Sequence, residues 1–513
     1  MNGAQLALQA AVDAGVDVCF ANPGTTEMEL VAAVDHVPGM RAVLGLFEGV
    51  VTGAADGYGR VTGGPALTLL HLGPGFANGI ANLHNARRAH TPIVNLIGDH
   101  ASWHVDADAP LTSDIESLAR PVSRHLATVS SAARAGTTVR DAIAAASGPP
   151  SGVSTVIVPQ DSAWGSAGVH DASASVAEGF DIDEDAVEQT ARQLRGGGRV
   201  VLLLGGVVRR AELDAAAAIQ AATGCGVWID TFPAVLEQGA GIPRFDSLPY
   251  FPEQAIDALA DVDALVAVGT SAPVAFFGYR HLGVSSLLPA GAASSVLVPG
   301  GVRAHRGLDA LASALDVSAA RSPAATDPAE IPGGDLDVMS MGATIAALQP
   351  EGAIVVNEAA TSGLGWAIAS TGAPPHETLA LTGGAIGMGL PVAVGAAVAA
   401  PDRQVIALQA DGSGMYTLQS LWTMARESLD VTVVICANRA YRILQMELHR
   451  TGHDDAGPQA RSLTDLTSPT PDWVALAKGF GVDGMQATTI AELRAGLEQG
   501  LATEGPFLVE VLL

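Results

Sequence analysis

The residues best suited to chemistry in this sequence are a carboxylate and a carboxamide, each following an apolar run. Asp411 comes directly after the run 405–410, and Asn438, 27 residues further on, comes directly after the run 431–437. A strand, a turn, a helix and a second strand of this length form one βαβ unit, whose crossover makes the two strands parallel. Both polar side chains are therefore expected at the carboxyl edge of one sheet, where α/β folds bind ligands.

The turn after Asp411 favours an anionic ligand. Gly412, Ser413 and Gly414 lead into a helical pattern, and a helix start offers free N–H groups and a partial positive charge to a phosphate. Mg²⁺ prefers oxygen ligands and keeps phosphate oxygens in its shell. The pattern therefore predicts a site for a magnesium-bound diphosphate. The alternative is an ordinary turn in which Asp411 caps the helix.

The elements that would position these residues alternate between buried strands and helices along the whole chain. Such an order is typical of an α/β protein with parallel sheets. We predict three doubly wound domains, at 1–165, 186–320 and 338–513, joined by linkers at 163–185 and 321–335 that are rich in small residues or in Pro and Gly. The expected strands include 16–20, 41–46, 65–72, 92–97, 199–204, 226–229, 264–268, 294–298, 353–356, 405–410, 431–437 and 506–513.

A weak internal repeat connects the first and last domains. Segments 66–99 and 405–438 share strand, glycine turn, helix and strand at nearly matched spacing, but only the second carries the expected metal ligands. The glycine turn of the first copy, Gly73-Pro74-Gly75, lacks the dinucleotide-binding fingerprint. We therefore do not expect a nicotinamide site there.

Composition excludes several classes of partner. The 513 residues carry a formal net charge of −27, which would repel nucleic acid and anionic membranes. No apolar run approaches the roughly 18 residues needed to cross a bilayer, and the start lacks a secretory pattern, so a cytoplasmic protein is expected. Cys19, Cys225 and Cys436 are too scattered for a metal site or a disulfide framework and are expected to be buried thiols.

The segment 405–438 resembles the thiamine-diphosphate motif, which begins Gly-Asp-Gly and ends in Asn after a spacer of this length; here Ala410 replaces the first glycine. Segment 46–60, LFEGVVTGAADGYGR, resembles the catalytic-glutamate segment of the same enzymes. The resemblance covers nearly the whole chain, in the order of acetolactate synthases and benzoylformate decarboxylases. It implies an aminopyrimidine-binding domain, a central domain and a diphosphate-binding domain.

Glu48 is the expected catalytic acid. It ends an apolar strand and precedes a small-residue helix, so it points from a sheet edge into a tight region. Thiamine diphosphate becomes reactive when a carboxylic acid shares a proton with its aminopyrimidine ring, and desolvation raises the pKa of such an acid. The alternative is a first-turn glutamate that favours the helix dipole.

The resemblance also implies the remaining site residues. The metal ligands would be Asp411, Asn438 and the backbone carbonyl of Ala440, and Ile386 would lie under the bent cofactor unless it is simply core. The implied cofactor-binding residues are Glu48, Asn357, Thr361, Ser362, Gly384, Ile386, Gly412, Ser413 and Tyr441.

The substrate pocket is less defined. Thr25 and His71 resemble the serine and histidine that face the substrate carboxylate in benzoylformate decarboxylases, although a histidine at a strand end is also a common structural residue. His100 and His104 follow the carboxyl end of a predicted strand and could also reach the pocket, whereas the role of His281 is left open. Leu444 stands where simple pyruvate decarboxylases carry a glutamate, and an apolar side chain there favours transfer to a second carbonyl.

The chain departs from true acetolactate synthases at Gln160, where those enzymes carry a lysine, and around 241–254, where no flavin pattern appears, so FAD is not expected. The resemblance implies a thiamine-diphosphate- and Mg²⁺-dependent lyase or transferase. It would decarboxylate a 2-oxo acid such as pyruvate and pass the product to an acceptor aldehyde or ketone. Alternatives are a benzoylformate-decarboxylase-like enzyme and a regulatory homologue that only binds the cofactor. The resemblance further implies sites shared between subunits, hence a homodimer at minimum and a homotetramer by expectation.

Overall fold

The structure is a computed structural model that describes residues 1–168, 180–317 and 328–513. Parts of the predicted linkers 163–185 and 321–335 lie outside these ranges. The chain divides into a larger unit, with residues 1–147, 152–168 and 328–513, and a smaller unit, with residues 148–151 and 180–317. Within the described residues no helix is both long and apolar enough to span a membrane.

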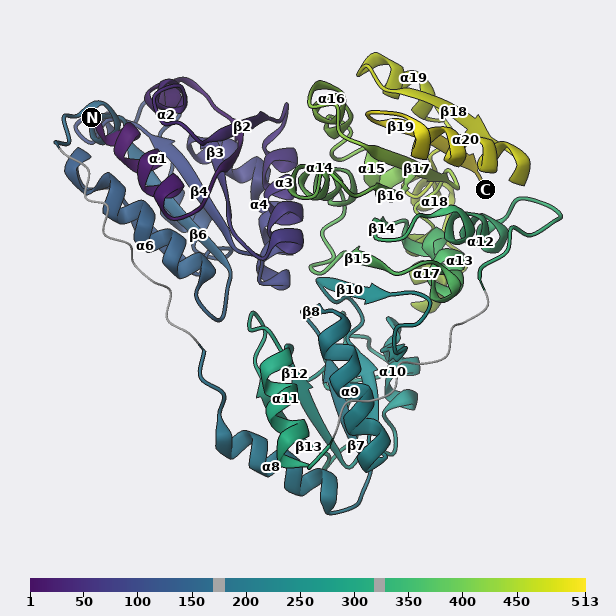
Figure 1. The fold of residues 1–513 in the computed structure, drawn as a ribbon. Coiled ribbons are helices and arrows are strands. Elements are labelled where there is room, and N and C mark those ends of the chain that lie inside the picture. The colour runs from purple at the N-terminus through teal and green to yellow at the C-terminus, as the bar shows by residue number, and fades with distance from the viewer. Residues whose placement is uncertain (169–179, 318–327) are drawn as a thin grey trace. The chain divides into compact units, whose positions relative to one another are not determined.

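The larger unit contains a six-stranded parallel sheet built from the N-terminal part of the chain, in the order β2-β1-β3-β4-β6-β5. Figure 1 shows α1 and α6 over one face of this N-terminal sheet and α3 and α4 over the other. Its elements are α1 (Gly3–Asp13), β1 (Val18–Asn22), η1 (Thr25–Glu27), α2 (Met28–Val34), β2 (Arg41–Leu44), α3 (Glu48–Thr62), β3 (Ala66–His71), α4 (Leu72–Ala89), β4 (Ile93–Asp99), α5 (Ile115–Ala119), β5 (His125–Thr128), α6 (Ala135–Ser147), β6 (Val153–Pro159) and α7 (Gln160–Trp164).

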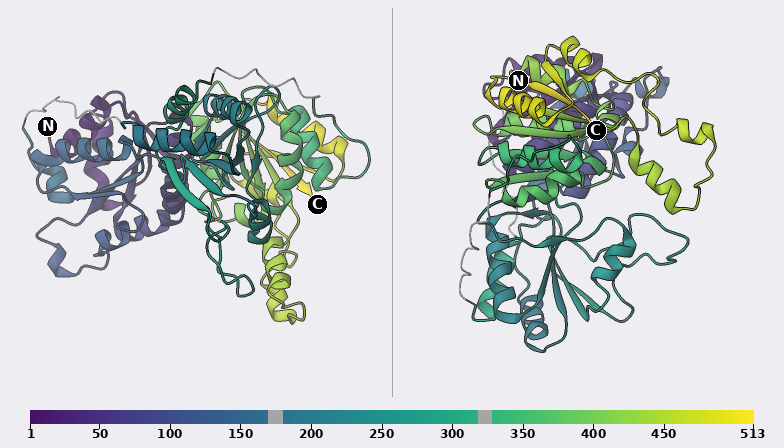
Figure 2. Two further views of the ribbon diagram at one scale, coloured as in Figure 1. Left: turned by 90° about the horizontal axis from the view of Figure 1, so that it is seen from below. Right: turned by 90° about the vertical axis from the view of Figure 1, so that its right-hand side faces the viewer.

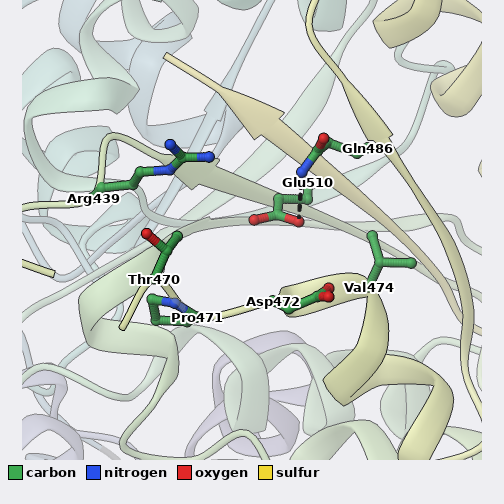
Figure 3. A pocket seen from close by; sticks show the side chains of 7 residues that line it. All are labelled: Arg439, Thr470, Pro471, Asp472, Val474, Gln486 and Glu510. Atoms are coloured by element: carbon green, nitrogen blue, oxygen red, sulfur yellow. Dashed lines mark hydrogen bonds between the residues drawn. The ribbon is translucent and has the colours of Figure 1, made fainter. Parts of the chain in front are cut away.

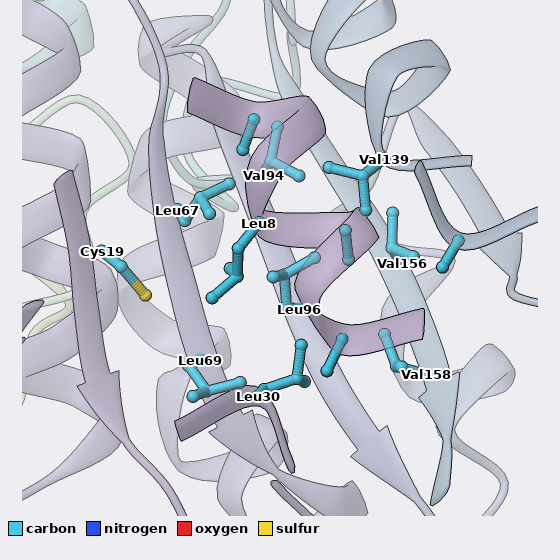
Figure 4. Close-up of a cluster of buried hydrophobic side chains, with 14 of the residues drawn as sticks. Leu8, Cys19, Leu30, Leu67, Leu69, Val94, Leu96, Val139, Val156 and Val158 are labelled. Carbon is cyan, nitrogen blue, oxygen red and sulfur yellow. The ribbon is translucent and has the colours of Figure 1, made fainter. Parts of the chain in front are cut away.

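Small and branched apolar side chains fill the core of the N-terminal sheet. Alternate residues of β3, β4 and β6 point to the same face, because strand side chains alternate, and they meet the apolar stripes of α1 and α6. Figure 4 shows this cluster, which includes Leu8, Leu67, Leu96, Val139 and Val156. Cys19 lies in the same cluster as a free thiol, and burial raises its pKa to about 12.

The C-terminal part of the chain forms a second parallel sheet in the larger unit, in the order β15-β14-β16-β17-β19-β18. Helices α12 and α20 pack on one face of this C-terminal sheet and α14 packs on the other. Its elements are α12 (Val338–Leu348), β14 (Ile354–Glu358), η4 (Ala360–Gly363), α13 (Leu364–Ala369), β15 (His376–Ala380), α14 (Gly389–Ala399), β16 (Val405–Ala410), α15 (Asp411–Gly414), α16 (Ser420–Arg426), β17 (Val431–Ala437), α17 (Arg442–Arg450), α18 (Pro458–Ser462), α19 (Trp473–Gly479), β18 (Asp483–Ala487), α20 (Ile490–Ala502) and β19 (Phe507–Leu512).

These two sheets share one topology. When the strands of each are numbered in chain order, both sheets read second, first, third, fourth, sixth, fifth. The weak repeat seen between segments 66–99 and 405–438 is therefore part of a duplication of the whole sheet. It places β3-α4-β4 and β16-α15-α16-β17 at equivalent positions.

The smaller unit is a third α/β body, around a parallel sheet in the order β11-β9-β7-β12-β13. The predicted fold class, with three parallel α/β sheets, is thus confirmed, and the smaller unit provides the third sheet. Its elements are α8 (Glu184–Arg195), β7 (Val200–Leu204), β8 (Val207–Val208), α9 (Arg210–Thr223), β9 (Gly226–Ile229), β10 (Val235–Gln238), β11 (Asp246–Ser247), α10 (Pro252–Ala258), β12 (Ala264–Val268), β13 (Ala293–Val298) and α11 (His305–Ala314).

One segment of the larger unit leaves its sheet. Both views of Figure 2 show the yellow-green helices α17 and α18 extending away from the body of the C-terminal sheet. None of the residues of α17 or α18 is buried. The segment begins at Tyr441 and therefore starts beside the predicted metal ligands.

Candidate active site

The structure places Asp411 and Asn438 at the carboxyl ends of β16 and β17, which are adjacent and parallel. Asp411 is 2% exposed. Its Oδ1 accepts the backbone N–H of Gly412 at 2.8 Å, and its Oδ2 accepts the backbone N–H of Arg439 at 2.7 Å. The two turns are therefore joined through the aspartate, as the spacing of 27 residues in the sequence predicted.

Asn438 is held in one orientation by both ends of its amide. Its Oδ1 accepts the backbone N–H of Ala440 at 3.0 Å, and its Nδ2 donates to Ser362 Oγ at 3.4 Å. Arg439, between the two predicted ligands, has φ 55°, a left-handed conformation that is uncommon outside glycine. This strained turn brings the amide oxygen of Asn438 and the backbone of Ala440 together beside Asp411.

The chemistry of this group fits a magnesium ion. Burial raises the pKa of Asp411, while the N–H groups of Arg439 and Gly412 oppose that rise, and a bound cation would favour the ionised form in the same way. Within the described part of the chain, no cluster of three or more His, Cys, Asp or Glu could hold a metal. A cation at Asp411 would therefore take its other oxygens from the Asn438 amide, the Ala440 carbonyl and the phosphates of a ligand, a set that Mg²⁺ accepts.

The turn after Asp411 is closely packed behind the site. A side chain at Gly412 would lie 2.6 Å from the Tyr441 ring, and the Tyr441 hydroxyl donates to the Gly412 carbonyl at 3.4 Å. Ser413 is buried and accepts a hydrogen bond from Gln409 Nε2 at 2.6 Å. All three predicted cofactor residues of this region thus lie together. The expected glycine turn is itself a short helix, α15, which starts at Asp411.

The other cofactor-binding residues of the C-terminal sheet follow β14 and β15. Asn357 is the penultimate residue of β14, Thr361 and Ser362 lie in η4 shortly after it, and Ser362 reaches Asn438. Gly384 has φ 75°, is exposed and faces open space. Ile386 is half-buried, so its side chain is not part of the closed core.

Helix α4 of the same chain supports the segment around Gly384. Asn85 is fully buried, donates from Nδ2 to the Ala385 carbonyl at 2.7 Å and accepts the Ala385 N–H at 3.1 Å. Arg60 of α3 donates to the Ala380 carbonyl at 2.6 Å and to Thr382 at 3.1 Å. The backbone beside Ile386 is therefore fixed from the N-terminal part of the chain.

Glu48 begins α3 and is half-buried. Its Oε2 accepts a hydrogen bond from Asn78 Nδ2 at 3.0 Å. A side chain at Gly75 would lie 2.9 Å from Glu48 Oε1 and 3.2 Å from His71 Cβ. Gly75, in the first turn of α4, therefore leaves room for Glu48, the predicted acid, and His71 to lie close together at the edge of the N-terminal sheet.

His71 pairs with a carboxylate that the sequence analysis did not select. Its Nδ1 lies 2.8 Å from Glu27 Oε2, and Glu27 is fully buried. The hydroxyl within reach of His71 belongs to Thr26, at 3.2 Å, whereas Thr25 is exposed at the start of η1. A side chain at Gly98 would lie 1.9 Å from Glu27 Oε1, so β4 leaves room for this carboxylate.

The three other histidines noted in the sequence, His100, His104 and His281, lie in two different units. The rings of His100 and His104, after β4, meet edge to face with centroids 5.5 Å apart. His100 Nε2 is buried and has no hydrogen-bond partner among the residues that the structure describes. His281 lies in the smaller unit, where its Nε2 is 2.7 Å from Glu253.

The side chain of Arg439 lines a different cavity from the one its backbone helps to form. Figure 3 shows this pocket, which has a volume of about 450 Å³. Glu510 on its floor is 2% exposed, and burial raises the pKa of this carboxyl. The pocket is lined by Arg439, Thr470, Pro471, Asp472, Val474, Gln486 and Glu510.

Comparison with known proteins agrees with this geometry. Residues 1–118 match the family model of the N-terminal TPP binding domain of thiamine pyrophosphate enzymes, and residues 361–511 match that of the C-terminal TPP binding domain. The chain is 49% identical to a Mycobacterium tuberculosis protein named after the acetolactate synthase large subunit, IlvX, over 100% of this chain and 99% of that protein. It is 29% identical to a benzoylformate decarboxylase of Pseudomonas aeruginosa, over 97% and 96% of the two chains.

Solved structures give the same result. A thiamine diphosphate-dependent 4-hydroxybenzoylformate decarboxylase of Rhodococcus jostii superposes with a TM-score of 0.83 at 26% identity, covering 100% of this chain and 99% of that one. A benzoylformate decarboxylase of Polynucleobacter necessarius shares the fold, with a TM-score of 0.84 at 20% identity and coverage of 100% and 98%. The chain therefore belongs to the thiamine-diphosphate-dependent enzymes, in the group of lyases and transferases that act on 2-oxo acids and include acetolactate synthases and benzoylformate decarboxylases.

Proposed function

We propose that this protein is a Mg²⁺- and thiamine-diphosphate-dependent decarboxylase or carboligase that acts on a 2-oxo acid such as pyruvate. The observation that carries the proposal is the oxygen set at the ends of β16 and β17. There, Asp411 is buried and held by two backbone amides, and Asn438 is fixed by Ala440 and Ser362. Such a preorganised set suits an octahedral cation that also binds a diphosphate.

When bound, thiamine diphosphate supplies a nucleophilic carbon that adds to the keto group and accepts the electrons left by departing carbon dioxide. The residues of this chain bind, orient and protonate. Asp411, Asn438 and the Ala440 carbonyl would hold the ion, and Gly412 and Ser413 would meet the diphosphate. Ile386 would contact the cofactor, and the Glu48 carboxyl would exchange a proton with the aminopyrimidine ring.

We also propose that each site is shared between two subunits. Arg60 and Asn85 contact the segment that leads to Gly384 from the far ends of α3 and α4. Glu48 lies at the other end of α3, about 18 Å from Arg60 at roughly 1.5 Å per helical residue. Glu48 therefore lies at the end of α3 that is distant from the contact with the Gly384 segment of its own chain, which supports a homodimer at minimum; a homotetramer is our expectation.

Two features bear on the choice of substrate. His71, Thr26 and the buried Glu27 form a polar group beside Glu48, which suits recognition of a substrate carboxylate, and a benzoylformate-type acid is the second candidate donor. Leu444 is 48% exposed on α17, and an apolar side chain over the site would exclude water and favour transfer to an acceptor aldehyde or ketone. The three buried free thiols suit a reducing compartment, so we place the protein in the cytoplasm.

The role of Glu48 is tested by the variant Glu48→Gln. We expect the variant to bind thiamine diphosphate with nearly wild-type affinity, because the metal and diphosphate contacts are unchanged. Exchange of the cofactor's C2 proton with deuterium, followed by NMR after acid quench, should fall by at least about a hundredfold, the scale of a lost general acid. Normal exchange and turnover in this variant would show that Glu48 is not the acid.

The substrate is tested with a panel of 2-oxo acids: pyruvate, benzoylformate and longer aliphatic acids, each with and without an added aldehyde. Carbon dioxide release measures decarboxylation, and product identification separates protonation from carboligation. We expect carbon–carbon ligation products from at least one acid. If the only product is the aldehyde formed by loss of carbon dioxide and gain of a proton, the benzoylformate-decarboxylase-like alternative is favoured.

A further inference from the structure

Three segments of the C-terminal sheet carry the residues proposed to contact the cofactor. One buried side chain of the first segment bonds to residues that follow the second and, through Gln409, is linked to the third. The segments are 357–362, from the end of β14 into η4, 384–386, before α14, and 412–413, in α15. Glu358 is the last residue of β14 and is 3% exposed. It is a carboxylate in the interior without a neighbouring cation among its hydrogen-bond partners in the described structure, which is unusual for a charged group.

The carboxylate of Glu358 accepts hydrogen bonds from two backbone N–H groups in the stretch of chain that follows Ile386. Its Oε1 accepts the backbone N–H of Gly387 at 2.6 Å, and its Oε2 accepts that of Gly389 at 2.6 Å. These two amides flank Met388 and directly follow Ile386. The carboxylate therefore closes the loop that carries Ile386 into the start of α14.

Gln409 extends the network to the diphosphate turn. It is the register partner of Glu358 in the adjacent strand β16. Its Nε2 donates to Glu358 Oε2 at 3.1 Å and to Ser413 Oγ at 2.6 Å. A side chain at Gly389 would lie 2.2 Å from Gln409 Oε1 and 3.0 Å from Glu358, so the glycine at this position makes room for both side chains.

From this geometry we infer that Glu358 is a positioning residue for the cofactor: it fixes the Ile386 loop and, through Gln409, the Ser413 turn relative to the 357–362 segment. This inference rests on the proposed function of those segments. It goes beyond it because Glu358 itself does not face the ligand.

Both oxygens of Glu358 are needed as acceptors. A glutamine at this place would direct an NH₂ group at a backbone N–H, and one amide would lose its partner. The loop would then shift to find another acceptor. Burial raises the pKa of Glu358, and the donors at Gly387, Gly389 and Gln409 act against that rise by stabilising the ionised form.

The test compares Glu358→Gln with Glu377→Gln, a matched control on the same sheet. Glu377 is also mostly buried, at 8% exposure, and pairs with Arg403 at 2.7 Å, but it lies near the start of β15. Each apo-protein is titrated with thiamine diphosphate and Mg²⁺ while its tryptophan fluorescence is followed. The temperature is kept well below the midpoint of thermal unfolding of every variant. Thermal unfolding of the same samples measures the general loss of stability.

We expect both variants to unfold at lower temperature, and only Glu358→Gln to raise the apparent dissociation constant of the cofactor, by at least tenfold. The substrate KM at saturating cofactor should change much less. Equal cofactor affinity in Glu358→Gln and wild type would overturn the inference. If wild type itself fails to bind the cofactor, it is the proposed function that fails.

A second variant covers the case in which Glu358→Gln does not fold. Gln409→Met keeps the two hydrogen bonds that Glu358 accepts from backbone N–H groups but removes the link to Ser413. We expect it to weaken cofactor binding severalfold with the chain still folded. Unchanged affinity in Gln409→Met would show that the Ser413 turn is positioned without Glu358 and would overturn that part of the inference.

Discussion

At the scale of single residues, the site depends on a carboxylate that is costly to bury without a cation. Asp411 has two N–H donors but no basic side chain hydrogen-bonded to it in the described structure, and burial raises its pKa. A divalent ion would compensate the buried charge directly. Cofactor binding should therefore depend on the metal, because phosphate oxygens brought beside Asp411 without a cation would be repelled.

This dependence predicts that metal removal releases the cofactor. After incubation with a chelator and dialysis, the protein should lose nearly all bound thiamine diphosphate, measured by absorbance or by conversion to fluorescent thiochrome. Readdition of Mg²⁺ with the cofactor should restore occupancy, whereas the cofactor alone should not. Full retention in the absence of divalent metal would contradict the role given to Asp411.

The residues that sequence reasoning identified are those that a local motif marks. Asp411 and Asn438 follow apolar strands at a recognisable spacing, and Glu48 opens a recognisable helix. Glu27 and Glu358 carry no such mark, because their importance comes from partners far along the chain: His71 for the first and Gly387 for the second. Each lies within two residues of a residue already selected, Thr25 for Glu27 and Asn357 for Glu358, and that nearness in the sequence was the available signal.

At the scale of elements, the contact between α3 and α14 positions both halves of the larger unit. Figure 1 shows these helices side by side, and glycines allow the close approach. A side chain at Gly57 would lie 2.1 Å from the Val392 carbonyl, and one at Gly395 would lie 1.8 Å from the Ala54 carbonyl. Since Glu48 begins α3 and the Ile386 loop leads into α14, this packing sets the relative position of two predicted site regions within one chain.

The close approach predicts that Gly395→Ala destabilises the protein. The new methyl group would meet backbone rather than a flexible side chain, so the helices must separate, and overpacking of this kind costs about 1–3 kcal/mol. Gly479→Ala is the control, since Gly479 lies in α19 with open space around it and alanine is the better helix former. The midpoint of urea unfolding should fall for Gly395→Ala and stay equal or rise for Gly479→Ala; the reverse order would contradict the packing.

Several element boundaries follow from the sequence alone, whereas others differ: the strands predicted at 16–20 and 41–46 are Val18–Asn22 and Arg41–Leu44. The runs at 226–229, 264–268, 405–410 and 431–437 are strands as predicted, because buried parallel strands are continuous apolar runs bounded by turns. The helix expected directly after Gly414 begins only at Ser420, and a separate short helix occupies Asp411–Gly414. Packing of Gly412 against Tyr441, which no local pattern reveals, accompanies that early turn.

At the scale of the whole molecule, the shared strand order of the N-terminal and C-terminal sheets suggests how two binding halves arose from one topology. The N-terminal half carries Glu48, the proposed acid, and the C-terminal half carries the proposed metal ligands. In the proposed dimer, each complete site combines the N-terminal half of one subunit with the C-terminal half of the other. Closed twofold symmetry then produces two identical sites per dimer.

Shared sites predict that two inactive variants restore activity when they are co-expressed. In a heterodimer of Glu48→Gln with Asp411→Asn, one site receives both intact residues and the other receives neither. Random pairing makes about half of the dimers mixed, so activity should reach about a quarter of wild type, whereas a site within one chain would give none. A double variant carrying both changes, co-expressed with wild type, is the control. Shared sites leave about a quarter of the activity, because only wild-type pairs work, and sites within one chain leave about half.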